Sequence, residues 1–128
     1  MARFLVHRHA AGRSHFDLRL IQDERVRSWS LLKEPPVRTG EKRLAIEREA
    51  ISIEAVSRLT ITEEAFGAGK ARIWDSGEVS VTADAPGRLT LVFSGARLSG
   101  RYELRRMRWY PGNRWLLEKS VIRDAILT

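Results

Sequence analysis

The sequence predicts an all-β fold, a barrel or a sandwich. Three observations support this prediction. Short segments alternate apolar and polar residues, glycines and prolines separate these segments at regular intervals, and no long segment has a clean helical period. Many short strands divided by turn residues are typical of barrels and sandwiches. A chain of 128 residues is long enough to bury such a core as one domain.

The first half of the chain contains a predicted strand, a hairpin and further strands. Residues 3–9 place Phe4 and Val6 on one face. Residues 15–21 and 26–32 alternate on either side of a polar turn at 22–25, which is the pattern of a β-hairpin. Two prolines and a glycine between 35 and 40 mark a loop. Residues 42–47, 51–56 and 58–62 resemble further strands, although 46–55 also fits a helix.

The second half continues with short alternating segments. A glycine-rich loop at 67–69 precedes predicted strands at 71–74, 78–82 and 89–93. The turn residues Asp75-Ser76-Gly77 separate the first two strands, and Pro86-Gly87 separates the next two. Residues 101–107 and 115–119 complete the set on either side of a turn at 111–113.

Charge and residue types narrow the classes of function. The chain has 23 Lys and Arg residues against 16 Asp and Glu, a formal net charge of +7. A small basic domain favours a polyanionic partner, with nucleic acid ahead of an acidic membrane. The absence of cysteine excludes disulfides and thiolate metal sites. No apolar run approaches bilayer length and the N-terminus lacks a signal-peptide core, so we expect a cytoplasmic protein.

All three histidines lie in one short stretch, HRHAAGRSHFDLRLI, which covers residues 7–21. Within it, Phe and Leu alternate with polar residues, as expected for a strand whose successive side chains point to opposite faces. The apolar face is explained as core. The opposite face then holds an imidazole, a carboxylate and a guanidinium in one line, from His15, Asp17 and Arg19.

His9, His15 and Asp17 are candidate metal ligands. Two imidazole nitrogens and one carboxylate oxygen suit zinc or another transition metal with open coordination positions, provided that the loop 10–14 brings His9 beside His15. Arg19 lies next in line and offers a planar fork for phosphate, so the combination suggests phosphoryl chemistry. The alternative is a solvated polar face. His7 lies on the same face but is not required as a ligand.

Several motifs, in order, resemble those of one known family. FLVHRHAAGRSHFDLRL resembles its aromatic-led strand, K/R-H, short loop and H-[YF]-D-[FL]-R-L. Its later motifs are matched by SWSLLKEPP, KRLAIERE, FGAGKARIWDSG, LVFSGARLSGRYELRRM and WLLEKS. On these motifs the chain is identified as a member of the 3′-phosphoesterase domain family of bacterial DNA ligase D, and as one of its stand-alone, archaeal-type members.

The resemblance implies a compact β-barrel with short turns and little helix, in which residues 1–128 form one 3′-phosphoesterase-like domain. It implies a role in DNA repair through the removal of a 3′-terminal ribonucleoside and then a 3′-phosphate, which leaves a 3′-hydroxyl. The activity would depend on manganese or another divalent transition metal. We expect DNA or RNA–DNA primer-template 3′ ends as substrates, a separate ligase or polymerase as partner, a monomer, and no membrane binding.

The resemblance also assigns roles to residues. It places the metal ligands on His9, His15 and Asp17, in agreement with the strand-face argument. It places the phosphate-binding side chains on Arg19, Lys33 and Arg43. These six residues are the predicted catalytic set.

The chain departs from the family pattern at several positions, and two of these departures affect the active site. Ile51 and Ala55 stand where the family has an active-site histidine and tyrosine. Neither side chain can transfer a proton or donate a hydrogen bond to phosphate. One hypothesis is therefore an enzyme whose two steps have unequal rates, with His7 as the candidate to take over the missing role. The other is a nucleic-acid-end-binding barrel that has lost turnover.

Overall fold

The computed structural model describes residues 2–10, 14–54, 71–110 and 112–121. Nearly all regular structure in these ranges is β-strand. The strands are β1 (Ala2–His9), β2 (His15–Gln22), β3 (Arg25–Leu31), β4 (Lys42–Ser52), β5 (Ala71–Ala85), β6 (Arg88–Gly95), β7 (Ser99–Arg106) and β8 (Arg114–Lys119). Within the same ranges, no helix has the length and apolar character needed to cross a membrane.

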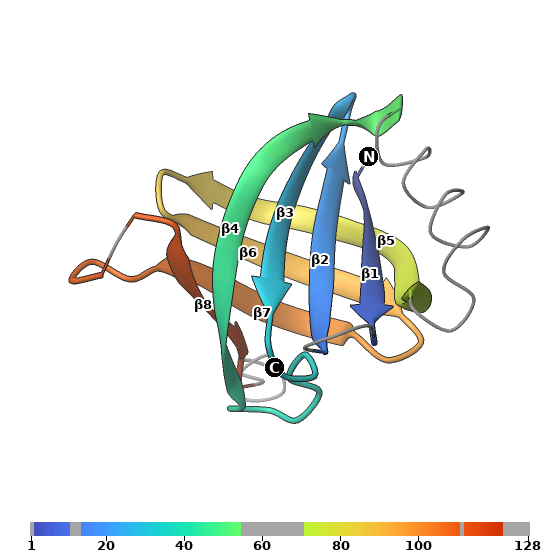
Figure 1. The fold of residues 1–128 in the computed structure, drawn as a ribbon. Coiled ribbons are helices and arrows are strands. Elements are labelled where there is room, and N and C mark those ends of the chain that lie inside the picture. Colours follow the sequence, from blue (N-terminus) through green and yellow to red (C-terminus); the bar gives the residue numbers. More distant parts are fainter. Residues whose placement is uncertain (1, 11–13, 55–70, 111, 122–128) are drawn as a thin grey trace.

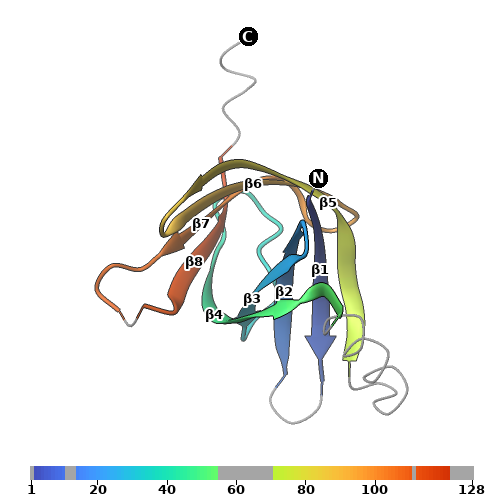
Figure 2. The same ribbon diagram turned by 90° about the horizontal axis from the view of Figure 1, so that it is seen from above.

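The eight strands form a closed barrel in the order β1-β2-β3-β4-β8-β7-β6-β5. Each neighbouring pair is antiparallel. Figure 1 shows β1–β4 running across the front of β5–β7, and Figure 2 shows the same strands from above. Closure pairs the backbone groups that a sheet edge would otherwise expose. The predicted all-β barrel is confirmed, and of the two folds that the strand pattern allowed, the barrel is the correct one.

The hairpin predicted around residues 22–25 is present as β2 and β3. Its turn is Asp23–Glu24, and Asp23 has a positive φ of 57°, a conformation that aspartate tolerates better than most residues. This two-residue turn fixes the register of the two strands. As a result, Asp17 lies opposite Ser30, and Arg19 lies opposite Ser28.

Strand β4 is longer than its sequence pattern predicted. Residues 42–52 form one continuous strand, which pairs with β3 and with β8, rather than two strands separated near 48. The alternative helix over 46–55 is wrong for 46–52, because these residues belong to β4 and pair with β3. Helical backbone is confined to Ile53 and Glu54 in this part of the described chain. The predicted strand at 58–62 and the loop at 67–69 lie outside the described residues.

Strand β5 also differs from the prediction, because Asp75-Ser76-Gly77 lies inside it and forms no turn. Residues 71–79 of this strand pair with β1, and residues 77–85 pair with β6, so β5 closes the barrel. The pairing of β5 with β1 has a register shift between Val6 and His7, an irregularity of the kind that lets a strand bend as β5 passes from β1 to β6. The turn-like residues are explained by tertiary contacts. A Cβ on Gly77 would lie 2.7 Å from the carbonyl oxygen of Ser94.

The buried Asp75 carboxylate holds the loop between β6 and β7. It accepts hydrogen bonds from the backbone N–H groups of Ala96, Arg97 and Leu98, at 3.1, 2.9 and 2.7 Å. Gly95 lies directly against this carboxylate and leaves no room for a Cβ. One acidic side chain therefore satisfies three donors that the tight loop would otherwise leave unpaired.

The barrel interior is an apolar core with aromatic rings at its centre. Phe93 packs edge-to-face on Phe4 and on Tyr102, with ring centroids 4.8 and 5.0 Å apart. The Tyr102 hydroxyl donates a 2.6 Å hydrogen bond to the carbonyl oxygen of Pro36, and burial raises the pKa of Tyr102 to about 12. Tyr102 therefore stays a proton donor and ties the loop after β3 to the core.

We expect Asp75→Ala to lower the free energy of unfolding by about 3 kcal/mol, because it leaves several backbone donors without an acceptor. Urea unfolding measures the change. Asp84→Ala on the same strand is the matched control, because Asp84 is exposed and its removal should change stability by less than about 0.5 kcal/mol. Equal stability of the two variants would contradict this account of Asp75.

Candidate metal centre

The first two strands place every histidine of the chain on one face of the sheet. In the β1–β2 register His7 lies opposite Asp17, and His9 lies opposite His15. The intervening residues, such as Phe16 and Leu18, are buried in the core. Because side chains alternate across a strand, the core positions of β2 force its polar positions to the outer face of the barrel.

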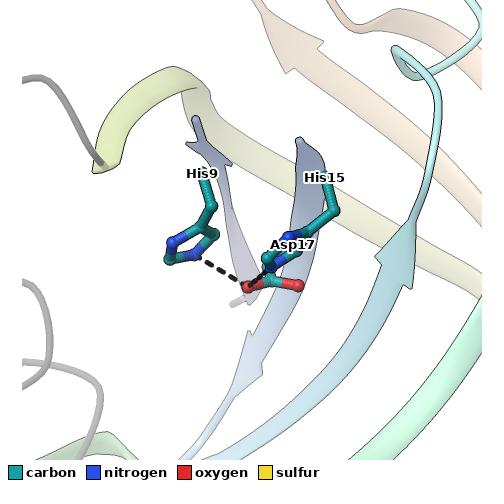
Figure 3. A group of neighbouring side chains, drawn as sticks. All are labelled: His9, His15 and Asp17. Atoms are coloured by element: carbon teal, nitrogen blue, oxygen red, sulfur yellow. Dashed lines mark ion pairs between the residues drawn. The ribbon is translucent and has the colours of Figure 1, made fainter. Parts of the chain in front are cut away.

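His9, His15 and Asp17 converge on one point, as Figure 3 shows. One ligand atom from each lies within 4.8 Å of the other two. The Nε2 atoms of His9 and His15 lie 2.9 and 3.6 Å from the same carboxylate oxygen, Oδ2 of Asp17. The two imidazole rings stack with centroids 4.6 Å apart. The three predicted ligands are therefore brought together in space.

The chemistry of this donor set fits a divalent transition metal. Two imidazole nitrogens and one carboxylate oxygen suit manganese, iron or zinc, and three protein ligands leave coordination positions for water or substrate. All three side chains are partly buried, with His15 the most exposed at 35%. A group held there would therefore remain accessible from solvent.

A second layer of side chains orients the Asp17 carboxylate. Ser30 on β3 donates a 2.7 Å hydrogen bond to Oδ1 of Asp17, the oxygen that the two histidines leave open. Arg48 on β4 in turn donates from Nε to the Ser30 hydroxyl at 3.1 Å. This chain of contacts directs Oδ2 toward the histidines. Groups of this kind tune the ligands of metal sites in proteins.

Arg19 is buried beside the ligand cluster, with 7% of its surface exposed. Its Nη2 lies 3.8 Å from Oδ2 of Asp17, and its Nη1 donates to the Ser28 hydroxyl at 3.3 Å. Its Nε donates to Nδ1 of His7 at 3.5 Å. Burial, together with the charge of Arg19, lowers the pKa of His7 to about 4. His7 is therefore neutral near pH 7 and can accept this bond, which fixes the guanidinium fork in one orientation.

An open pocket of about 320 Å³ covers this face. It is lined by His15, Asp17, Arg19, Ser28, Ser30, Arg48 and Glu49. Its position beside the three candidate ligands gives room for a phosphate group. Two arginines, Arg19 and Arg48, flank the pocket.

The other two predicted phosphate-binding residues, Lys33 and Arg43, lie together in an adjoining pocket that shares Ser30 with the first. Arg43 donates from Nε to the carbonyl oxygen of Glu34 at 2.7 Å, and its Nη2 lies 3.5 Å from Glu41. Hydrogen bonds from the backbone N–H groups of Arg38 and Val37 lower the pKa of the Glu41 carboxyl. This loop therefore keeps a negatively charged carboxylate beside Arg43.

The structure thus groups His9, His15, Asp17 and Arg19 in one cluster and places Lys33 and Arg43 next to it. Their roles as ligands and phosphate contacts stay predictions. Ile51 belongs to β4, and Ala55 lies outside the described residues.

Sequence reasoning missed Ser28, Ser30 and Arg48. The two serines were predictable, because the two-residue turn pairs them with Arg19 and Asp17. The position of Arg48 beside Ser30 could not be predicted without the pairing of β4 with β3.

Comparison with known proteins identifies the family. The family described as DNA Ligase D 3′-phosphoesterase domain matches residues 7–106. The chain is 37% identical over 121 residues to the multifunctional non-homologous end joining DNA repair protein LigD of Mycobacterium tuberculosis. It is 32% identical to the LigD proteins of Mycolicibacterium smegmatis and Pseudomonas aeruginosa, over 129 and 127 residues.

These alignments cover 91% of this chain for the two mycobacterial proteins and 94% for the Pseudomonas protein. The chain spans 15–16% of the length of these relatives. The match therefore concerns one part of much longer proteins. On the extent of the family match and on these identities, the chain belongs to the family of the DNA ligase D 3′-phosphoesterase domain.

Proposed function

We propose that this chain is a metal-dependent phosphoesterase that prepares DNA 3′ ends for repair. It removes a 3′-terminal ribonucleoside and then the 3′-phosphate, and leaves a 3′-hydroxyl for a ligase or polymerase. The family is named for 3′-phosphoesterase activity, and the relatives are named for DNA repair by end joining. The observation that carries the proposal is the convergence of His9, His15 and Asp17 beside the buried Arg19.

A divalent ion such as manganese, held by His9, His15 and Asp17, would supply Lewis-acid activation of a phosphate oxygen. The chain itself supplies orientation and charge. Ser30 keeps Asp17 turned toward the histidines, and Arg19 presents a preorganised guanidinium to the phosphoryl group. Fixed charges of this kind stabilise the charge that develops in phosphoryl transfer.

Substrate and partners follow from the same proposal. DNA or RNA–DNA primer-template 3′ ends carry the terminal phosphate that the site would bind, and the net charge of +7 favours their approach. A separate ligase or polymerase would use the 3′-hydroxyl product.

A second function is favoured by the two departures from the family pattern. Ile51 and Ala55 replace the active-site histidine and tyrosine of the family pattern, and so remove a proton donor and a hydrogen-bond donor. A barrel that binds nucleic-acid ends without turnover would need neither. The two functions differ in an assay on a primer with one 3′-ribonucleotide. Manganese-dependent loss of the ribonucleoside supports the enzyme, and binding without product at any metal concentration supports the binding protein.

We expect His15→Ala to lose metal binding and hydrolysis together, because it removes one of three ligands. Calorimetric titration with manganese measures the first, and the primer assay measures the second. Asp84→Ala, which removes an exposed carboxylate on β5, should retain both. Wild-type manganese affinity in His15→Ala would contradict the ligand assignment.

We expect Arg19→Ala to lower the hydrolysis rate about a hundredfold, as the removal of a preorganised charge donor does. Arg19→Lys keeps the charge but loses the fork, so it should recover only part of the rate. Lys33→Ala and Arg43→Ala should also slow hydrolysis. Arg101→Ala, an exposed arginine on β7, is the control. Wild-type turnover in the Arg19, Lys33 and Arg43 variants would rule out this phosphate site.

We expect the 3′-phosphate intermediate to accumulate. A 3′-phosphate carries more negative charge than a diester and has a poorer leaving group, so its hydrolysis depends more on proton and hydrogen-bond donors. Ile51 and Ala55 supply neither. A time course on a primer ending in one ribonucleotide resolves the intermediate from the 3′-hydroxyl product. Direct conversion to 3′-hydroxyl, unchanged in His7→Ala, would show that the missing pair is not needed here.

A further inference from the structure

One tryptophan is almost fully exposed. Trp109, in the connection between β7 and β8, has 92% of its surface exposed, whereas Trp29 and Trp115 are buried in the core. Tyr110 beside it is 51% exposed. Large aromatic side chains lose a favourable burial energy when they stay in water, so a pair of them at one place on the surface indicates a binding site.

These aromatics line an open groove of about 580 Å³ between the ends of two hairpins. We call it the hairpin groove and define it by Arg88, Arg105, Arg106, Arg108, Trp109 and Tyr110. None of the described residues that line it is acidic. Carboxylates behind the groove reach two of the arginines: Glu103 pairs with Arg88, and Glu118 pairs with Arg105. Among the described residues, no carboxylate lies within ion-pair distance of Arg106 or Arg108.

The groove is held in place by backbone hydrogen bonds at its base. The N–H of Arg106 donates to the carbonyl oxygen of Gly87 at 2.9 Å, and that of Met107 donates to Arg114 at 2.8 Å. The N–H of Glu47 on β4 donates to the carbonyl oxygen of Asn113 at 2.7 Å. The guanidinium of Arg114 lies over the Tyr110 ring, 5.9 Å from its centroid. Trp109 is therefore exposed on a connection that these hydrogen bonds hold to the rest of the barrel.

We propose that the hairpin groove binds single-stranded nucleic acid, with a base stacked on Trp109 and phosphates held by Arg106 and Arg108. Proteins hold single strands without reading their sequence by combining a positively charged groove with aromatic rings on which bases stack. Strands β3 and β4 separate β8 from β2 in the barrel order, so the groove is a second contact, away from the metal centre. It would hold an unpaired stretch of the strand whose end is processed, or of its complement.

Charge favours nucleic acid over a protein partner. Four arginines surround this aromatic pair, and none of the described residues that line the groove is acidic, so its charge is complementary to a polyanion. A protein with the complementary acidic surface, or a second copy of this chain, is the competing occupant. The binding experiment and a measurement of oligomeric state separate these cases.

Fluorescence anisotropy of a labelled DNA single strand with an ordinary 3′-hydroxyl end tests the proposal without any reaction. We expect Trp109→Ala to weaken binding about tenfold, the effect of losing one stacked base. Trp109→Phe keeps a ring and should retain most of the affinity. In the double variant Arg106→Ala, Arg108→Ala, the slope of log affinity against log salt should fall by about 0.7 for each phosphate that the protein no longer neutralises.

Arg101→Ala is the control for the loss of a positive charge outside the groove, because Arg101 is exposed near the opposite end of β7. The binding assay is run in EDTA without added metal, so failure of the proposed hydrolysis and failure of the groove give different results. Wild-type affinity in Trp109→Ala would overturn the proposal. So would a concentration-dependent dimer, seen by analytical ultracentrifugation, that Trp109→Ala dissolves without changing DNA binding.

Discussion

The two-residue period of β2 is the constraint on which the site depends. Phe16 and Leu18 must point into the barrel to fill its core, so His15 and Asp17 must point out. A shift of register by one residue would expose the core side chains and bury the charged ones. Hydrophobic burial therefore fixes the position of the candidate ligands, and the barrel supplies a rigid support for a site built from short, stiff side chains.

Asp17 is the residue at which the contacts of three strands meet. Its Oδ2 atom contacts His9 from β1 and His15 from β2. Its Oδ1 atom accepts a hydrogen bond from Ser30 on β3, and the Ser30 hydroxyl accepts one from Arg48 on β4. A carboxylate with this many partners is held in one orientation, which suits a metal ligand. Arg19 is held in a similar way by Ser28 and by the neutral ring of His7. The face is thus organised around the Asp17 carboxylate with Arg19 and Arg48 beside it, an arrangement that suits a bound cation and a phosphate.

The sequence pattern predicted the parts of this site that lie within one hairpin. His15, Asp17 and Arg19 follow from alternation, whereas Ser30 required the register of the turn, and Arg48 required a pairing between strands far apart in the chain. The prediction of a turn at Asp75 was wrong for a similar reason. The Asp75 carboxylate accepts hydrogen bonds from a loop more than twenty residues away, which the local sequence does not reveal. The exposure of Trp109 was not predictable either, since tryptophans are more often core residues and only the barrel shows which one is not.

We propose that the outer face of β1 and β2 holds one metal ion through His9, His15 and Asp17. A crystal structure of the protein soaked in manganese, with an anomalous difference map, tests it most directly. We expect one strong peak in contact with an imidazole nitrogen from each histidine and with an oxygen of Asp17. A peak at another place, with these three side chains apart, would contradict it.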